Sequence, residues 1–206
     1  MELRDALSQI AEIRARVAAA ERFRGYRAVP VALTGVLAVL AAAVQPLLVP
    51  DPAGDVGRYL RLWLWTAGVA AAVAGSGIWL RHRRTADRLT KQLTWLAVGQ
   101  FAPCLVAGAV VTLIVTRHAS EHAPLLPGLW QVFFSLGVFA SCRLLPRAVA
   151  AVGVVYLLGG AANLALAGGP AAYHPLAMGL PFGLGQLLTA AVLYWNLERT
   201  DHDPAA

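Results

Sequence analysis

Runs of apolar residues alternate with short polar segments along most of the chain. A transmembrane helix needs about 20 mainly apolar residues to cross the ~30 Å hydrocarbon core of a bilayer. Stretches that meet or nearly meet this requirement predict membrane-spanning helices at residues 29–49, 60–80, 93–116, 126–145, 148–168 and 176–197. The pattern therefore predicts an all-α fold, an integral membrane bundle of six transmembrane helices that occupies residues 26–199 and ends in a short cytoplasmic tail at 200–206.

Residues 1–25 follow a different pattern, in which apolar positions recur at helical spacing and charged residues fill the other faces. This predicts a cytoplasmic amphipathic helix that lies in the membrane interface, packs on the protein's own loops, or binds a second copy or another protein. The predicted partner or lipid surface consists of Leu3, Leu7, Ile10, Ile13, Val17, Arg22, Arg24 and Arg27.

Composition supports a membrane location, because 58% of the residues are hydrophobic and only 14% are charged. Soluble domains carry about 25% charged residues. The charged residues fall almost entirely outside the apolar runs, and a charge at the bilayer centre costs about 2.5–3.5 kcal/mol on insertion scales. The net charge of +6 could indicate nucleic acid, but the basic residues flank apolar spans, where anionic lipid head groups are nearer. We therefore expect a lipid bilayer and no nucleic acid as partner.

The distribution of basic residues predicts the orientation. Six spans place both termini on one side, and of the 17 Lys and Arg residues only Arg58, Arg61 and Arg117 fall on the other. The positive-inside rule then places both termini in the cytoplasm. Residues 1–28 lack the continuous apolar core of a signal peptide. Aromatic residues near span ends predict interfacial anchors, among them Tyr59, Trp63, Trp79, Trp95 and Tyr194.

The opening MELRDALSQIAEIRA, the FRGYR that follows it and the hydrophobic spans resemble an uncharacterised group of bacterial multi-pass membrane proteins. The resemblance covers the first 30 residues and the general layout. It implies a multi-pass protein of the bacterial inner membrane. It implies no activity, cofactor or site.

Residues 118–122 read HASEH and match the H-x-x-E-H pattern of inverzincin metallopeptidases. The stretch lies in a short predicted loop, however, and Pro124 limits any helix beyond it. A second hypothesis is a metal site without peptidase activity. If a helix extends through His118 and His122, these two residues could bind Zn²⁺ or Cu²⁺ together with His174 from the next loop on the same side. Ordinary solvated histidines are the competing interpretation.

Uncharged polar residues occur within the predicted spans, and Gln100, Gln131, Asn163 and Gln186 could line a polar pocket for a neutral solute. The competing interpretation is interhelical hydrogen bonding, worth about 0.6 kcal/mol per bond. The polar residues considered within the spans are not ionisable, which argues against proton-coupled or ion-driven carriers; they are Gln45, Gln100, Gln131, Asn163, Gln186 and Asn196.

Small residues and prolines predict how the helices pack. Gly68, Ala72 and Ser76 form a stripe at four-residue spacing, and Gly179 and Gly183 form a G-x-x-x-G. Such stripes let helix backbones approach closely. Pro103 and Pro181 fall inside spans and predict kinks there.

A short repeat is visible as HAPLLPGLWQ, from His122, and HPLAMGLPFG, from His174. It predicts two related hairpins of the same orientation, as in transporters built from parallel repeats.

These patterns support one leading function and two alternatives. We expect a non-enzymatic scaffold, sensor or regulatory membrane component that acts through partners, with no catalytic residues and no cofactor. The alternatives are a small transporter or channel for a neutral or lipophilic solute, and a metal site at the external face. Cys104 and Cys142 lie in apolar runs and form no C-x-x-C pair.

Overall fold

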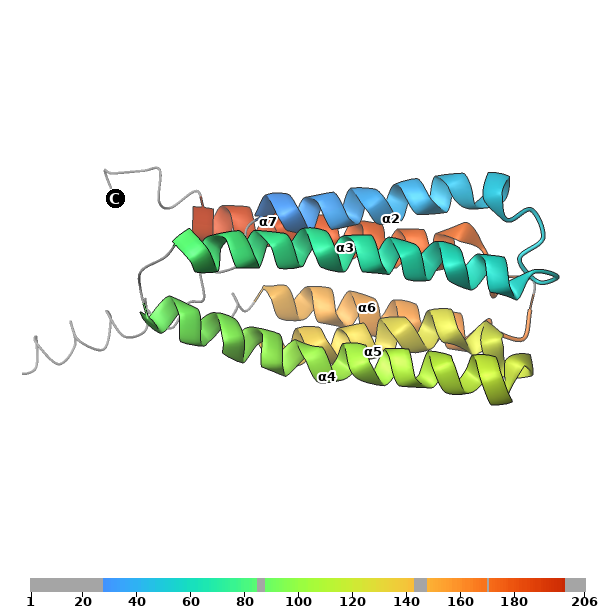
Figure 1. Cartoon of the computed structure of the whole chain (residues 1–206). Helices are drawn as coiled ribbons and strands as arrows, with labels where there is room; N and C mark the ends of the chain where they lie inside the picture. The colour runs from blue at the N-terminus through green and yellow to red at the C-terminus, as the bar shows by residue number, and fades with distance from the viewer. Residues whose placement is uncertain (1–27, 85–87, 143–147, 170, 199–206) are drawn as a thin grey trace, which may run out of the picture.

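The computed structural model describes residues 28–84, 88–142, 148–169 and 171–198. Figure 1 shows long helices that run side by side and reverse direction at each connection. The α-helices in this part of the chain are α2 (Ala28–Leu48), α3 (Val56–Arg84), α4 (Arg88–His118), α5 (Leu126–Ser141), α6 (Val149–Ala165) and α7 (Pro175–Leu193). A 3₁₀ turn, η1 (Ser120–Leu125), precedes α5, and a π-helical turn, η2 (Tyr194–Glu198), follows α7.

The all-α, multi-pass class predicted from the sequence is confirmed. Five helical segments within the described residues are long and apolar enough to cross a bilayer: Ala28–Leu48, Val56–Leu80, Val98–His118, Ser120–Ser141 and Pro175–Asn196. The six-span count is not confirmed, because the helix at the fifth predicted span, α6, has only 17 residues. The predicted amphipathic helix at 1–25 and the tail at 200–206 lie outside the described residues.

Local sequence explains where two of the helices begin. Asp55 precedes α3, and its Oδ1 accepts a hydrogen bond of 2.9 Å from the backbone N–H of Arg58, the usual N-cap arrangement. His174 precedes α7, where its Nδ1 accepts from the backbone N–H of Leu176 at 3.2 Å. Pro175 then occupies the first turn of α7, a position that needs no backbone N–H.

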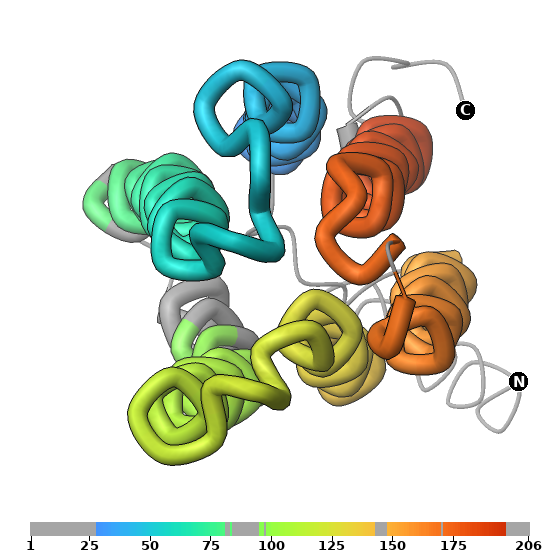
Figure 2. The backbone as a smooth tube through the Cα atoms, turned by 90° about the vertical axis from the view of Figure 1, so that its right-hand side faces the viewer, coloured from blue at the N-terminus to red at the C-terminus, as the bar shows by residue number. Residues whose placement is uncertain are grey.

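Viewed along the bundle, the helices form a ring in chain order from α2 to α7 (Figure 2). Within the described residues, α2 with α7 and α5 with α6 make the most extensive contacts, whereas α3 and α4 touch only briefly. At the two extensive contacts, glycines allow the helix backbones to approach closely. A β-carbon on Gly128 of α5 would lie 2.8 Å from the Gly160 carbonyl oxygen of α6, and one on Gly35 of α2 would lie 3.0 Å from the Gly183 oxygen of α7. Small residues therefore permit close backbone approach, as the sequence predicts.

The two strings of the short repeat place a glycine at corresponding positions, Gly128 and Gly179. Gly128 packs against α6, and Gly179 packs against Ala42 of α2. Each repeat glycine thus marks the point where its helix meets the next one in the ring.

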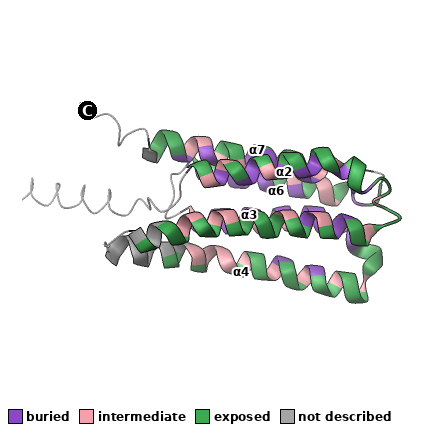
Figure 3. Cartoon of the chain, turned by 45° about the horizontal axis from the view of Figure 1, so that its top comes forward, coloured by how far each residue is buried: buried purple, intermediate pink, exposed green. Residues whose placement is uncertain are grey.

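The two ends of the bundle differ in packing. At the end that carries the connections α2–α3, α4–α5 and α6–α7, here called the Tyr173 end, a buried apolar cluster includes Val49, Tyr59, Trp63, Leu126 and Tyr173. A second, smaller cluster lies between α2 and α7 and contains Ala28, Val31, Ala190 and Leu193. Figure 3 shows purple, buried residues along α2 and α7, whereas α3 and α4 are mostly exposed or intermediate.

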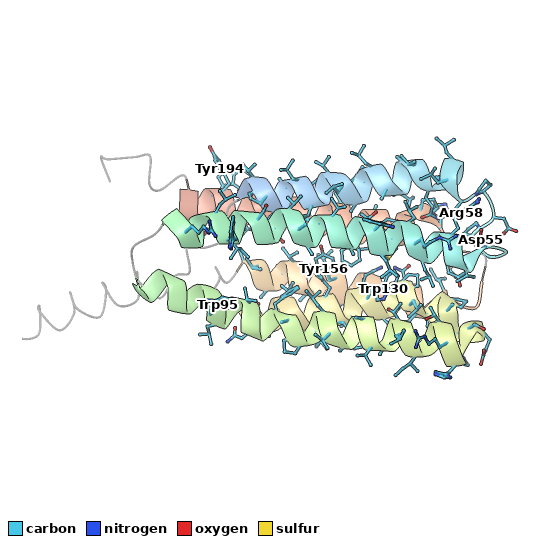
Figure 4. The ribbon with its side chains drawn as sticks, in the orientation of Figure 1. Asp55, Arg58, Trp95, Trp130, Tyr156 and Tyr194 are labelled. Atoms are coloured by element: carbon cyan, nitrogen blue, oxygen red, sulfur yellow. The ribbon has the colours of Figure 1, made fainter. Side chains whose placement is uncertain are left out.

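Of the aromatic residues predicted to be interfacial anchors, some are exposed near one end of the bundle and two are buried. Trp95 and Tyr194 lie toward the end opposite Asp55 and Arg58 (Figure 4), and both are well exposed. The prediction is wrong for Tyr59 and Trp63, which are buried. Their rings pack together under the loops of the Tyr173 end, with centroids 6.5 Å apart, so they stabilise that end instead of facing lipid.

Candidate functional site

A proline in α7 creates the central polar feature of the bundle. Pro181 has no N–H, so the carbonyl of Ala177, four residues earlier, receives no helical hydrogen bond from it. Gln131 Nε2 of α5 and Asn163 Nδ2 of α6 each donate to the Ala177 oxygen at 2.8 Å. In hydrocarbon no water can satisfy such a carbonyl. The two amides therefore replace the missing bond and join three helices.

A second polar link connects the other side of the ring at the Tyr173 end. Gln45 of α2 is almost completely buried, and its Nε2 donates to the Tyr173 carbonyl at 2.8 Å. Its Oε1 accepts from Trp63 Nε1 of α3 at 3.0 Å. Both ends of this amide are thus occupied, and the residue ties α2 and α3 to the α6–α7 connection. Burial raises the pKa of the Tyr173 phenol above its ordinary value, so the hydroxyl stays neutral beside the Tyr59 ring.

Not every buried polar atom in the bundle has a partner. Gln131 Oε1, Ser135 Oγ and Tyr156 Oη make no hydrogen bond of good geometry, although Gln186 lies near enough to influence the Tyr156 hydroxyl. All three side chains are completely buried, and the Tyr156 hydroxyl abuts Gly185. These atoms are enclosed by packed side chains, so they line a filled seam between α5, α6 and α7.

Aromatic rings surround this seam. Phe134 lies at the centre, with ring centroids 5.0 Å from Phe101 of α4, 4.8 Å from Tyr156 of α6 and 5.3 Å from Phe182 of α7. Tyr156 and Trp130 lie between the helices in Figure 4. Tilted and edge-to-face pairs at this spacing are favourable beyond the area they bury. The cluster therefore packs α4 against the α5–α7 part of the ring.

The structure brings together some of the residues predicted to form a polar pocket. Gln131 and Asn163 meet on the Ala177 carbonyl, and Gln186 lies beside Tyr156. Gln100 is on α4, where its Oε1 is buried without a partner. The arrangement matches the competing interpretation of interhelical hydrogen bonds for Gln131 and Asn163. A pocket for a solute stays a prediction.

Sequence reasoning missed Ser135, Tyr156 and the bond between Trp130 Nε1 and Thr112 Oγ1 of 2.8 Å. Only one signal was available. A proline inside a span marks the carbonyl four residues earlier as an acceptor, and uncharged amides in other spans are the natural donors. Combining the two would have pointed to Ala177.

The three histidines of the predicted metal site lie in different structural settings. The α4 helix ends at His118, and His122 falls in the separate turn η1, so the two do not share one helix face. His122 Nδ1 lies 3.2 Å from Glu121 Oε1 at the exposed surface, and His174 caps α7. Among the described residues, no group of three His, Cys, Asp or Glu side chains is placed to hold a metal ion. The metal hypothesis stays a prediction, and HASEH does not form the helix that inverzincin chemistry needs.

The most unusual surface of the bundle is on α3. No residue from Leu64 to Leu80 is buried, and only 6% of the apolar span of α3 is buried, against 44% for the segment that contains α5. Between positions 66 and 78 the only large exposed residue is Val69. The other exposed positions there are small: Ala67, Gly68, Ala71, Ala72, Gly75 and Ser76.

Other helices present large side chains to the membrane. On α4 the exposed positions include Leu105, Val110 and Leu113, and on α7 they include Leu180 and Leu184. Large apolar side chains suit lipid, whereas small residues are enriched where transmembrane helices meet each other. The exposed surface of α3 between 66 and 78, here called the α3 small-residue face, therefore has the composition of a helix–helix contact without the second helix.

No family model, curated protein or solved structure matches the chain. The class of protein rests on the described residues alone: a multi-pass helical membrane protein, with a lipid bilayer as its surroundings.

Proposed function

We propose that the protein is a non-enzymatic component of a bacterial inner membrane that scaffolds, senses or regulates by binding a protein partner within the bilayer. The α3 small-residue face is the single observation that supports this best. It is exposed, apolar and small along several helical turns, and a transmembrane helix of a partner could approach it closely. We further propose that both termini lie in the cytoplasm, because the basic residues concentrate on that side.

The interior of the bundle supports this proposal over transport. Gln45, Gln131 and Asn163 donate hydrogen bonds that hold helices together, and the seam around Tyr156 is filled. A carrier for a neutral solute would need polar groups that face an open cavity, whereas the unpartnered atoms of Gln131, Ser135 and Tyr156 are completely buried. The predicted surface at residues 1–25 would act together with the α3 face, one in the cytoplasm and the other in the membrane.

Site-specific photo-crosslinking in native membranes tests the proposal. A photoreactive phenylalanine analogue at Trp65, which is 73% exposed on α3, should give a discrete protein adduct. The same analogue at Leu184, 51% exposed on α7, is the matched control and should give lipid adducts only. Because a close helix–helix contact needs small residues, the Trp65 adduct should disappear when Gly68→Leu and Gly75→Leu are combined.

Lipid adducts alone at both positions would contradict the proposal, and so would a protein adduct that survives the two glycine substitutions.

Deleting residues 1–24 separates the two predicted surfaces. The adduct at Trp65 should persist if α3 binds its partner directly, and the cytoplasmic interaction of the amphipathic segment should be lost.

A further inference from the structure

Basic residues are concentrated where α3 ends and α4 begins, at the end of the bundle opposite the Tyr173 end (Figure 1). The segment 81–91 reads RHRRTADRLTK and contains a single acidic residue, Asp87. Its Lys and Arg residues are Arg81, Arg83, Arg84, Arg88 and Lys91. Positive charge therefore exceeds negative charge in this segment, and basic clusters next to a transmembrane helix favour anionic lipid head groups.

One cation of this cluster stacks on an aromatic ring. The guanidinium carbon of Arg83 lies 3.9 Å from the centre of the Trp79 ring, one helical turn earlier on α3, which is a cation–π contact. Arg83 is exposed, and Trp79 is 54% exposed. A stacked guanidinium keeps the N–H groups along its edge available, and two of them can donate to one phosphate group. Trp79 therefore orients Arg83 for binding a phosphate.

The surface next to Arg83 is apolar, as the acyl chains of a lipid require. Trp79 and Leu80 of α3, and Trp95 and Leu96 of α4, are each between 45% and 67% exposed. Within the described residues α3 and α4 touch only briefly, so lipid can reach both helices. Exposed tryptophan favours the head-group layer of a bilayer. Arg83 thus lies at the level where phosphate groups meet hydrocarbon.

We propose that the Trp79–Arg83 pair binds the head group of an anionic phospholipid. Arg83 donates two hydrogen bonds to the phosphate, the other cations of segment 81–91 add positive potential, and the acyl chains lie along the apolar surface beside Leu80. A zwitterionic lipid fits less well, because the cluster repels its ammonium group. A free phosphate ion offers the same oxygens but has no acyl chains to place on that surface. This site goes beyond the proposed function, since it requires no protein partner.

Native mass spectrometry of the full chain tests the proposal. The protein is released from nanodiscs that contain equal amounts of phosphatidylglycerol and phosphatidylcholine with identical acyl chains, and the lipids that stay bound are counted. Phosphatidylglycerol should be retained in excess. Arg83→Gln should lower the ratio of phosphatidylglycerol to phosphatidylcholine about fivefold, the usual contribution of one cation near an anionic membrane. Trp79→Leu keeps every charge but removes the stacking, and should lower the ratio about twofold or more.

Arg117→Gln is the matched control, since Arg117 is an exposed arginine in the last turn of α4, at the Tyr173 end. It removes the same charge and should leave the ratio unchanged. Equal retention of the two lipids by the wild type would overturn the proposal. Equal effects of Arg83→Gln and Arg117→Gln, or no effect of Trp79→Leu, would also overturn it, because net charge alone would then attract the lipid.

A change of buffer distinguishes a lipid from a free anion. Replacing acetate by inorganic phosphate at equal ionic strength should leave phosphatidylglycerol bound, because the acyl chains also contribute to binding. Displacement by phosphate would show that the site binds a free anion, and would overturn the lipid assignment. The photo-crosslinking at Trp65 involves neither Trp79 nor Arg83, so this proposal and the proposed function can fail separately.

Discussion

The α5–α6–α7 side of the bundle and the α3–α4 side are built from similar apolar sequences but are packed differently. On the first side, glycines bring backbones together and two amides satisfy the carbonyl that Pro181 leaves open. On the second side, α3 has no buried residue from Leu64 to Leu80. Hydrophobicity alone therefore places a helix in the bilayer, whereas small residues and paired polar groups decide which helices touch.

The largest expected effect comes from filling a closed contact. Gly128→Leu should lower the free energy of unfolding by about 3 kcal/mol or more, because overpacking against a backbone cannot be relieved by side-chain movement. A β-carbon at this position would already lie 2.7 Å from Leu164 Cγ and 2.8 Å from the Gly160 oxygen. Gly68→Leu, in open space, should change stability by about 0.5 kcal/mol or less. Denaturation in mixed detergent–lipid micelles measures both, and equal losses would contradict the comparison.

Removing both amides from the Ala177 carbonyl should have the next largest effect. Combined Gln131→Leu and Asn163→Leu should cost about 2–3 kcal/mol, since a buried carbonyl is left unpaired. Each single substitution should cost about 0.6 kcal/mol, because the other amide remains. Pro181→Ala restores a backbone N–H four residues after Ala177 and should recover part of the loss in the double variant. If the costs of the two single substitutions simply add, and Pro181→Ala restores no stability to the double variant, then the amides do not stabilise the bundle by pairing with the Ala177 carbonyl.

Substituting the link at the Tyr173 end should have a smaller effect. Gln45→Met keeps the volume but leaves Trp63 Nε1 and the Tyr173 carbonyl without their partners, at a cost of about 2 kcal/mol. Trp63→Phe should cost clearly less in the Gln45→Met background than in the wild type, as expected for residues in one hydrogen-bonded network. A double-mutant cycle with no coupling would rule the link out.

The smallest expected effect is a pH dependence at Tyr173. Burial raises the pKa of this phenol, so the folded state keeps its proton when the unfolded state loses it, near pH 10. Stability from this group is therefore complete below about pH 10 and falls as pH rises further. Tyr173→Phe should make the fall between pH 9 and 11 shallower, while leaving stability at pH 7.5 nearly unchanged, because the hydroxyl has no hydrogen-bond partner. Identical pH profiles would contradict this.

The sequence was sufficient for the helical membrane class because hydrocarbon imposes long apolar runs on any chain that crosses it. It was less reliable on length: the run at 148–168 predicted a full span, yet α6 ends at Ala165. Apolar Leu and Ala continue beyond that point, and composition alone does not show where the last turn stops.

The candidate site was harder to predict. Gln131 and Asn163 share a partner because three helices meet at one level, and no spacing within a single helix encodes that meeting. The exposure of α3 could not be predicted either, since an apolar run has the same sequence pattern whether it faces lipid or protein. The stripe of Gly68, Ala72 and Ser76 did indicate a helix contact, but not which helix would make it. Whether His118, His122 and His174 bind metal stays a prediction for metal analysis of the purified protein.

An accessibility scan of α3 tests the central claim most directly, namely that its small-residue face is a contact surface and not a lipid surface. Single spin labels placed along residues 64–80 in bilayers report collisions with dissolved oxygen, which concentrates in lipid. We expect protection at Gly68 and Gly75 as well as at Gly77, whose β-carbon position lies 3.0 Å from Pro30 of α2. A 3.6-residue oscillation with high oxygen collision at Gly68 and Gly75 would show that only lipid covers this face, and would contradict the claim.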